Sequence, residues 1–454
     1  MEESNFSTRR ASLCQLLPET AIIVSAATHH IRSHDSEFPF HQNTHFKYLT
    51  GFREPESLLV ITQKPDEGMK THFFVRPKDD HAEMWAGKRM GIDHTKDVFG
   101  FDEVYDIAKA WELMPTLLWN HKKVAVDWSE QPLIRDQALK VMTTMASMRK
   151  RKMHRPMSLI DLAPAIGRVR LVKEANEIAS MRKAAQISNL GHRAAMAMAT
   201  PGKTEADVRH FMEYIFRKHG SEDNAYESIV AGGRNALTLH YVENNAVLND
   251  KELLLIDAGS QFNGYASDIT RTFPINGKYT PAQKEVYEIV LTAQKVAIGM
   301  AKPGVSISQI HSEVEKVLAK AMIDAGLITT KTQMSKESLE ELLLNKEGSY
   351  AIKSYYPHGT SHWLGLDVHD MSPYLEDDLE DIKLAAGMVI TVEPGLYFNK
   401  PHEQVQFKLP VDGIGIRIED DILITDKGHD NLSANVPKEV AEVEAACKLN
   451  PLEF

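Results

Sequence analysis

With 454 residues, the chain is long enough for about two to four domains, each with a sizeable core. Hydrophobic residues make up 43% and charged residues 25%, which excludes a mainly disordered or fibrous chain. The net charge of −11 argues against a general nucleic-acid binder, and two cysteines, Cys14 and Cys447, are too few for a disulfide framework.

No segment of the sequence has the length and apolar character of a membrane-spanning helix. The longest apolar runs, such as residues 253–256, fall far short of the roughly 18 residues that a spanning helix needs. The start, Met1-Glu2-Glu3, lacks the basic and then apolar regions of a secretory signal. We therefore expect a cytoplasmic protein with neither a membrane nor a nucleic acid as its partner.

The first part of the chain, residues 1–172, alternates short β-type runs with polar helical segments, which favours a mixed α/β domain. The basic run at 149–152 resembles a nucleic-acid patch, but in an acidic chain we expect a solvated helix end. A long helical pattern begins near residue 172, so we place a domain boundary there. We expect strands at 21–24, 57–61, 71–75 and 123–126, and a helix at 133–148.

The second part, residues 173–454, contains two similar pairs of predicted helices. The first pair runs from 174 to 220 and is interrupted by Met-Ala-Thr-Pro-Gly-Lys-Thr at 198–204. The second pair starts with an N-cap Thr280 and ends near residue 326, and Met-Ala-Lys-Pro-Gly-Val-Ser interrupts it. This shared Pro-Gly joint indicates an internal duplication, although Pro-Gly is also a common helix stop. After it, 327–349 predicts a helix with loops, and 350–436 is rich in β-type runs.

Two aspartates flank a predicted hairpin in the first half of this domain. Asn263-Gly264 is a strong two-residue turn signal, and the register that it sets places Asp257 opposite Thr270. Asp257 and Asp268 then share one sheet face as diagonal neighbours, roughly 7–8 Å apart. Two such carboxylates repel each other unless a cation lies between them. The alternative of a loop aspartate beside a salt-bridged one stays open for this hairpin taken alone.

Three histidines and two glutamates mark the second half. His358, His362 and His369 lie within twelve residues among glycines and apolar residues, where imidazole serves as a metal ligand or proton shuttle. Glu393 lies within the β-type run 389–395. Strict alternation in 413–422 places Arg417 and Glu419 on one strand face, away from Ile414, Ile416 and Ile418. The alternatives are a satisfied core histidine and an Arg–Glu pair on a solvent-facing strand.

The combined set indicates a dinuclear metal site. Four carboxylates match the charge of two divalent cations, and the single imidazole adds one nitrogen ligand. Oxygen-rich ligation with one nitrogen favours Mn²⁺, with Co²⁺ or Zn²⁺ as alternatives. The predicted metal ligands are Asp257, Asp268, His362, Glu393 and Glu419.

These motifs resemble aminopeptidase P, a branch of the pita-bread metallopeptidases that include prolidase, creatinase and methionine aminopeptidase. The resemblance is carried by Asp-Ala-Gly at 257–259 with Asp-Ile-Thr-Arg-Thr-Phe-Pro at 268–274, and by the runs at 358–369, 391–397 and 413–421. It extends to Tyr-Leu-Thr-Gly-Phe at 48–52 and Ala-Glu-Met-Trp at 82–85 in the N-terminal part. The segment 327–349, which precedes His358, departs from the family pattern by being longer than usual.

The resemblance implies an N-terminal aminopeptidase P domain at 1–172 and a pita-bread catalytic domain with a pseudo-twofold repeat at 173–454. It implies a metal-dependent aminopeptidase that releases the first residue from peptides with proline in second place, by attack of a metal-bridging hydroxide. It also implies a homo-oligomer, dimer or tetramer. The open alternatives are prolidase, which cleaves dipeptides only, and a non-catalytic binding module of the same fold.

The same resemblance assigns roles to the site residues. Asp257 would bind one metal, His362 and Glu393 the other, and Asp268 and Glu419 both. Glu393 would also carry a proton to the leaving nitrogen. His240 and His369 would hydrogen-bond the substrate and the developing oxyanion, His358 would line the proline pocket, and Arg417 would orient its neighbour Glu419.

Overall fold

The computed structural model describes residues 5–64, 68–148, 153–332 and 334–454. The chain divides into two units, residues 1–170 and 171–454, and the expected boundary near 172 lies two residues further along. The basic run at 149–152 lies outside the described residues.

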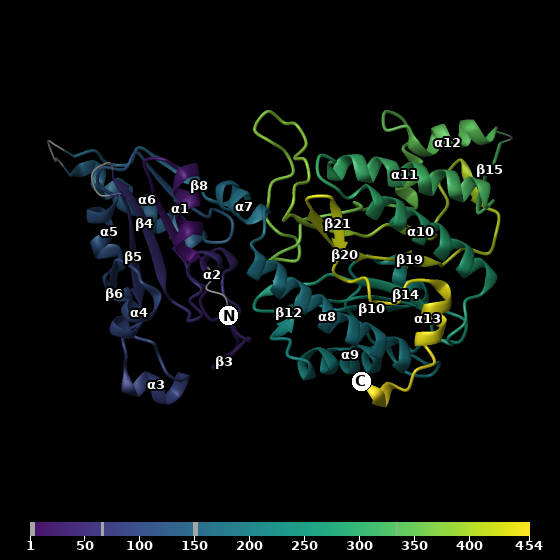
Figure 1. Ribbon diagram of the computed structural model, residues 1–454, viewed down its shortest axis with the longest axis horizontal. Coiled ribbons are helices and arrows are strands. Elements are labelled where there is room, and N and C mark those ends of the chain that lie inside the picture. The colour runs from purple at the N-terminus through teal and green to yellow at the C-terminus, as the bar shows by residue number, and fades with distance from the viewer. Residues whose placement is uncertain (1–4, 65–67, 149–152, 333) are drawn as a thin grey trace. The chain divides into compact units, whose positions relative to one another are not determined.

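The N-terminal unit is built on a mixed sheet of six described strands (Figure 1). They are β1 (Thr20–Ser25), β4 (Leu58–Lys64), β5 (Gly68–Val75), β6 (Glu103–Asp106), β7 (Lys123–Val126) and β8 (Ser158–Asp161). Their order is β6-β5-β4-β1-β7-β8, with β1 antiparallel to β4 and parallel to β7. β1 is buried along nearly its whole length, as its apolar composition requires of a central strand. The four strands expected in this unit are confirmed.

Helices and a short hairpin complete this unit. The helix expected at 133–148 is confirmed, and Pro132 occupies its first turn, where no backbone N–H is needed. The elements are α1 (Phe6–Leu16), β2 (Ile31–Ser33), β3 (Ser36–Glu37), α2 (Thr44–Thr50), α3 (Asp80–Ala86), α4 (Ile92–Phe99), η1 (Ile107–Lys109), α5 (Ala110–Leu118), α6 (Pro132–Ser147) and α7 (Ala163–Leu171), which ends at the boundary.

The first half of the C-terminal unit is a helix pair followed by two small sheets. The sheets have the strand orders β10-β11-β14 and β13-β12-β9. The sequence of residues 226–230 is strand-like, but the strand begins only at Ile229. The elements are α8 (Ala175–Met198), α9 (Glu205–Lys218), β9 (Asp223–Asn224), β10 (Ile229–Gly232), η2 (Gly233–Leu237), β11 (Leu253–Asp257), β12 (Ser260–Phe262), β13 (Tyr265–Ala266) and β14 (Thr270–Pro274).

The second half repeats the helix pair and adds further strands. Thr280 caps its first helix through a reciprocal pair of hydrogen bonds with Gln283, as expected. The segment 327–349 contains β15 and α12, which confirms a helix with loops. The elements are α10 (Pro281–Met300), α11 (Ile307–Asp324), β15 (Ile328–Thr330), α12 (Lys336–Leu344), η3 (Ala351–Ser354), β16 (Val389–Val392), β17 (Gly395–Tyr397), β18 (Val405–Phe407), β19 (Gly415–Arg417), β20 (Asp420–Thr425), β21 (Gly428–Asn431), α13 (Val440–Ala446) and η4 (Pro451–Glu453).

The two helix pairs are joined in the same way, which supports the internal duplication. Gly202 N–H donates to Leu248 O at 2.9 Å, and Gly304 N–H donates to Leu384 O at the same distance. In each half, the residue that accepts this bond lies five residues before a strand that ends beside the site. Leu248 precedes β11, and Leu384 precedes β16. Strands β10, β14, β19 and β20 lie between the pair α8–α9 and the pair α10–α11 (Figure 1). One hydrophobic core includes residues of all four helices.

Asn263 and Gly264 form the hairpin turn that the sequence predicts. Their φ angles of +52° and +83° are those that a two-residue turn of this kind requires. The register is also as predicted, because Phe262 pairs with Tyr265 and Asp257 pairs with Thr270. Gly259 permits the close crossing next to Asp257, since a Cβ there would lie 1.7 Å from Ser267 O.

Within the part of the chain that the structure describes, none of the helices has both the length and the hydropathy of a membrane-crossing segment.

Candidate metal centre

A pocket of about 250 Å³ in the C-terminal unit brings together every site residue expected from the sequence. They come from segments far apart in the chain, and Leu239, Gly359 and Ser361 complete the lining. The expected residues are His240, Asp257, Asp268, His358, His362, His369, Glu393, Arg417 and Glu419.

Asp257 and Asp268 face the pocket from the two ends of the predicted hairpin. Asp257 ends β11, and Asp268 lies two residues before β14. The hydroxyl oxygen of Tyr226 lies 2.6 Å from one carboxylate oxygen of each. A hydroxyl has a single proton to donate, so Tyr226 alone does not satisfy both charges.

His362 links one of these aspartates to Glu393. Its Nε2 lies 3.3 Å from Asp268 and 3.6 Å from Glu393, while Nδ1 donates to Trp363 O at 3.0 Å. That backbone bond fixes the tautomer and turns Nε2 toward the carboxylates. Burial would lower the pKa of His362, but Asp268 and Glu393 raise it to about 9. Main-chain bonds from Thr391 N to His362 O and from Glu393 N to Thr360 O hold the two segments together.

Glu419 enters the site just before β20. Its carboxylate accepts the hydroxyl proton of Thr270 at 2.6 Å, and its backbone N–H donates to Thr270 O at 3.0 Å. Ligand atoms of Asp268, His362 and Glu419 all lie within 4.8 Å of one another. Three donors at this spacing form a cluster that can hold a metal ion.

Arg417 supports the cluster from behind. One Nη donates to Asp257 at 2.5 Å and the other to the Tyr397 hydroxyl at 2.8 Å. Its Nε donates to Thr270 Oγ1 at 3.1 Å, and Thr270 in turn donates to Glu419. Arg417 therefore contacts Asp257 directly and reaches Glu419 through Thr270, whereas the sequence suggested a direct effect on Glu419.

The remaining histidines line the pocket in different states. His358 Nδ1 bonds Gly359 O, so its Nε2 accepts from Tyr397 at 2.9 Å. Burial, with the charge of Arg417, lowers the pKa of His358 to about 3 and keeps it neutral. The ring of His369 lies 4.3 Å from that of His362 between centroids, and burial lowers its pKa. His240 is exposed at the pocket wall.

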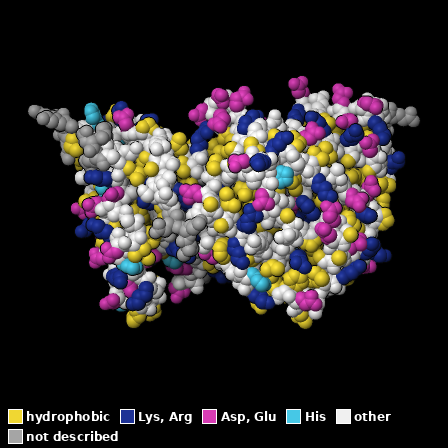
Figure 2. Space-filling view, in the orientation of Figure 1, with side chains coloured by type: hydrophobic (Ala, Val, Ile, Leu, Met, Phe, Trp, Pro, Cys, Tyr) yellow, Lys and Arg dark blue, Asp and Glu magenta, His cyan; other side chains and the backbone are white. Residues whose placement is uncertain are grey.

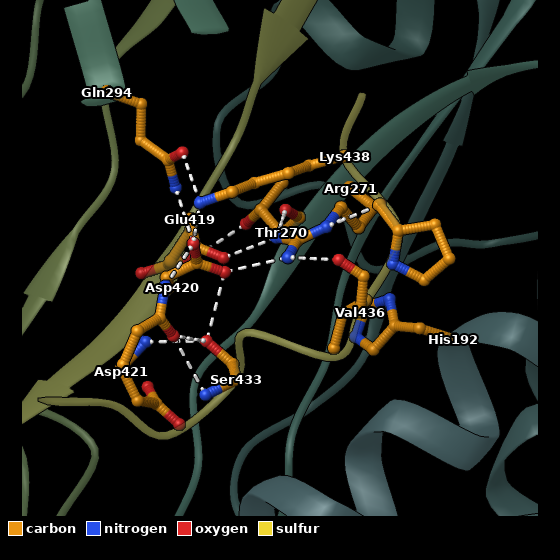
Figure 3. A network of polar contacts seen from close by, with 12 residues as sticks. His192, Thr270, Arg271, Gln294, Glu419, Asp420, Asp421, Ser433, Val436 and Lys438 are labelled. Carbon is orange, nitrogen blue, oxygen red and sulfur yellow. Dashed lines mark hydrogen bonds and ion pairs between the residues drawn. The ribbon is translucent and has the colours of Figure 1, made fainter. Parts of the chain in front are cut away.

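A buried network behind Glu419 fixes the backbone on which this glutamate sits (Figure 3). Arg271 donates to the main-chain oxygens of Thr270 and Glu419 and to the Asp420 carboxylate. Its other two N–H groups reach Val436 O and Pro437 O, so all five donors are used. Asp420 also accepts from Lys438, Gln294, Asn431 and Ser433.

The charge balance of the pocket fits divalent cations. Among the described pocket residues, Arg417 is a permanent cation and protonated His362 adds one charge, against four carboxylates. Burial raises the pKa of Asp257 and Glu419, and it raises that of Glu393 to about 7. Carboxylates buried at this density need cations to stay ionised. Oxygen donors with one imidazole are a donor set that divalent metals bind.

Two polar residues of the site did not emerge from the sequence. Tyr226 bonds both aspartates, yet its segment looked only like a strand. Thr270 joins Arg417 to Glu419 through hydrogen bonds. The sequence contained a signal that could have identified it, because Thr270 stands two residues after Asp268 and therefore on the same strand face.

Comparison with known proteins identifies both parts of the chain. The family model described as metallopeptidase family M24 matches residues 179–426, and that of the aminopeptidase P N-terminal domain matches residues 6–126. The chain is 37% identical over 451 residues to the Xaa-Pro aminopeptidase of Haemophilus influenzae, covering 98% of this chain and 97% of that one.

Solved structures agree. The structure of aminopeptidase P from Escherichia coli with the inhibitor Pro-Leu superimposes with a TM-score of 0.90 at 35% identity, covering 100% of both chains. The zinc-substituted Escherichia coli enzyme in complex with product gives the same TM-score at 36% identity, covering 98% of each chain.

Proposed function

This chain belongs to metallopeptidase family M24, and from that premise we propose that it is a metal-dependent Xaa-Pro aminopeptidase. The observation that carries the proposal is the convergence of four carboxylates and the imidazole of His362 from separate segments on a single pocket. The likeness to aminopeptidase P over 98% of the chain supports the same reaction.

We propose that Asp257, Asp268, His362, Glu393 and Glu419 hold two divalent cations, most favourably Mn²⁺, with Co²⁺ or Zn²⁺ as alternatives. Two divalent cations would bring four positive charges to the four carboxylates, which would relieve the repulsion between them. When bound, the metals supply Lewis acidity that polarises the scissile carbonyl and makes water nucleophilic near neutral pH.

The protein's own residues would do the remaining work. Water adds to the carbonyl carbon, the C–N bond to proline breaks, and Glu393 transfers a proton to the leaving nitrogen. Glu393 lies in the pocket beside His362, where its carboxylate would take this proton from the attacking water before passing it to the nitrogen. His240 and His369 would hydrogen-bond the substrate and the developing oxyanion, and neutral His358 would face the proline ring.

The domain assignment follows the family. We propose that residues 1–172 are the aminopeptidase P N-terminal domain and that residues 173–454 are the catalytic domain. We also propose a homo-oligomer, dimer or tetramer, in the cytoplasm, where two free cysteines stay reduced.

The proposed partners are peptides with proline in second place, with neither nucleic acids nor membranes. On the face that Figure 2 shows, acidic and basic side chains of the described residues are interspersed rather than gathered into a basic stripe. That distribution, with a net charge of −11, does not favour binding to a phosphate backbone.

The test is a peptide panel with added Mn²⁺, compared with the same protein after chelation. We expect release of the first residue from Xaa-Pro-Yaa tripeptides and longer peptides, and slow reaction where another residue replaces proline. Full activity in the chelated, metal-free protein would refute the metal-dependent mechanism.

A matched dipeptide and tripeptide with the same first residue separate this function from prolidase. An aminopeptidase must leave the cleft open beyond proline, so Xaa-Pro dipeptides should be the poorer substrates. A tenfold preference for the dipeptide in kcat/KM, about 1.4 kcal/mol in transition-state binding, would instead identify a prolidase.

A further inference from the structure

The loop that carries His240 has little regular structure of its own. After β10 it passes through η2 and returns to β11 only at Leu253, and His240 itself is exposed. A side chain on such a loop keeps a fixed position in a pocket only if other contacts, such as hydrogen bonds to the rest of the fold, hold the loop in place.

Glu205, the first residue of α9, holds this loop in place through hydrogen bonds. Its side chain is fully buried, and its carboxylate accepts four hydrogen bonds, each from a residue between 232 and 246. Oε1 accepts from Gly232 N at 2.7 Å and from Asn235 Nδ2 at 2.9 Å. Oε2 accepts from the Tyr241 hydroxyl and from Ala246 N, both at 2.8 Å.

In the sequence, the residues that donate these bonds lie on both sides of His240. Tyr241 is its immediate neighbour, and Gly232 and Ala246 lie near the two ends of the loop. Burial and the bond to Glu205 raise the pKa of Tyr241 to about 12, so this hydroxyl remains a donor. The backbone N–H of Glu205 also donates to Ala246 O at 2.9 Å, which closes the loop onto α9.

Asn244 also holds this loop through side-chain hydrogen bonds. It is buried with a φ of +46°, a conformation that asparagine tolerates better than most residues. Its side chain accepts from Val230 N at 2.7 Å and donates to Ser228 O at 2.8 Å. These two bonds tie the loop to β10 and to the segment before it, and a third, from Asn244 Nδ2 to Val242 O at 3.1 Å, lies within the loop.

We propose that Glu205 is a positioning residue for the proposed reaction, holding His240 at the pocket wall through the loop 232–246. This inference rests on the proposed function, because it assigns Glu205 an effect through a residue that would contact the substrate. The carboxylate suits the task because it is acceptor-only and faces four donors.

The experiment is a double-mutant cycle with Glu205→Gln and His240→Ala in the metal-loaded protein. A glutamine would turn an N–H₂ group toward two of the four donors, which should release the loop. We expect Glu205→Gln to lower kcat on a Xaa-Pro-Yaa peptide at least fivefold at unchanged metal content. In the His240→Ala background the same change should alter kcat less than twofold, because the side chain to be positioned is gone.

Glu177→Gln is the matched control. Glu177 is also a buried carboxylate in the first turn of a helix, and it accepts from Glu174 N and the Tyr265 hydroxyl. Both of these donors lie outside residues 232–246, so its replacement should leave kcat within twofold. Equal losses from Glu205→Gln in both backgrounds would overturn the proposal, as would a wild-type kcat in Glu205→Gln.

Two further measurements keep the result interpretable. If Glu205→Gln does not fold, Tyr241→Phe takes its place in the cycle, because it removes one donor and keeps the buried carboxylate. Hydrogen exchange of residues 232–246 should accelerate in Glu205→Gln and not in Glu177→Gln, whether or not the protein cleaves peptides. Unchanged exchange in Glu205→Gln would refute the anchoring role. If exchange accelerates in Glu205→Gln but the wild-type protein does not cleave the peptides, only the proposed function is refuted.

Discussion

The guanidinium group of Arg271 lies 2.7 Å from the carboxylate of Asp420, and neither side chain is exposed to solvent. Arg271 also bonds the main-chain oxygens of Thr270 and Glu419, so this ion pair fixes the backbone next to a proposed metal ligand. A buried pair of this kind is costly to break, because the remaining charge has no water to solvate it.

Replacement of Asp420 by Asn should therefore destabilise the protein strongly. Arg271 and Lys438 would lose their shared counter-charge, and the expected loss is about 3–5 kcal/mol in the free energy of unfolding. Urea unfolding measures it. Asp324→Asn, which removes an exposed ion pair with Lys336, is the control and should change stability little. Similar effects from the two variants would contradict the buried role.

Glu315 should make the protein sensitive to acid. Burial would raise its pKa, but bonds from His311 and Tyr350 and the charge of Lys353 lower it to about 2. Because the unfolded pKa is about 4.3, its stabilising effect is complete above that value and is lost as pH falls toward 2. Glu315→Gln should flatten the dependence of stability on pH in this window, measured by urea unfolding at a series of pH values. Glu341→Gln, at an exposed position, is the control and should leave the dependence of stability on pH unchanged.

Replacement of Glu419 by Gln tests the metal site. The change removes one negative charge while keeping the shape, and activity should fall well over tenfold, as it does when key groups are lost. Metal content, measured by elemental analysis, should fall with it. Wild-type activity and metal content in this variant would exclude Glu419 as a ligand.

His369→Ala should separate catalysis from metal binding. The His369 ring lies against that of His362, yet its proposed role is to hydrogen-bond the substrate and not to bind a metal. We expect kcat to fall much more than metal content, and His240→Ala should behave likewise. Loss of metal from His369→Ala would show instead that this residue is structural or a ligand.

The sequence predicted the composition of the pocket better than its bonding. The Asn263-Gly264 turn set the register that places Asp257 and Asp268 on one face, because turn geometry acts over a few residues. The contact of Arg417 with Asp257, 160 residues away, depends on how β19 packs across β11, and local patterns carry no information on that packing.

Buried polar anchors were the features least accessible from sequence. Glu205 stands in the first turn of α9, where an acidic residue is ordinarily explained by the helix dipole. Its four bonds arise because a loop about 30 residues further along folds back over it. The Arg271–Asp420 pair is likewise formed between strands of different halves.

The placement of the proposed ligands across the duplication has a thermodynamic consequence. Asp257 and Asp268 come from the first half, whereas His362, Glu393 and Glu419 come from the second. Metals bound there would act as a non-covalent cross-link across the seam between the halves. A ligand that binds only the folded state at 100 times its Kd adds about 2.7 kcal/mol to stability, so the melting temperature should rise with the free metal concentration. The protein's resistance to unfolding would then vary with the metal supply of its surroundings.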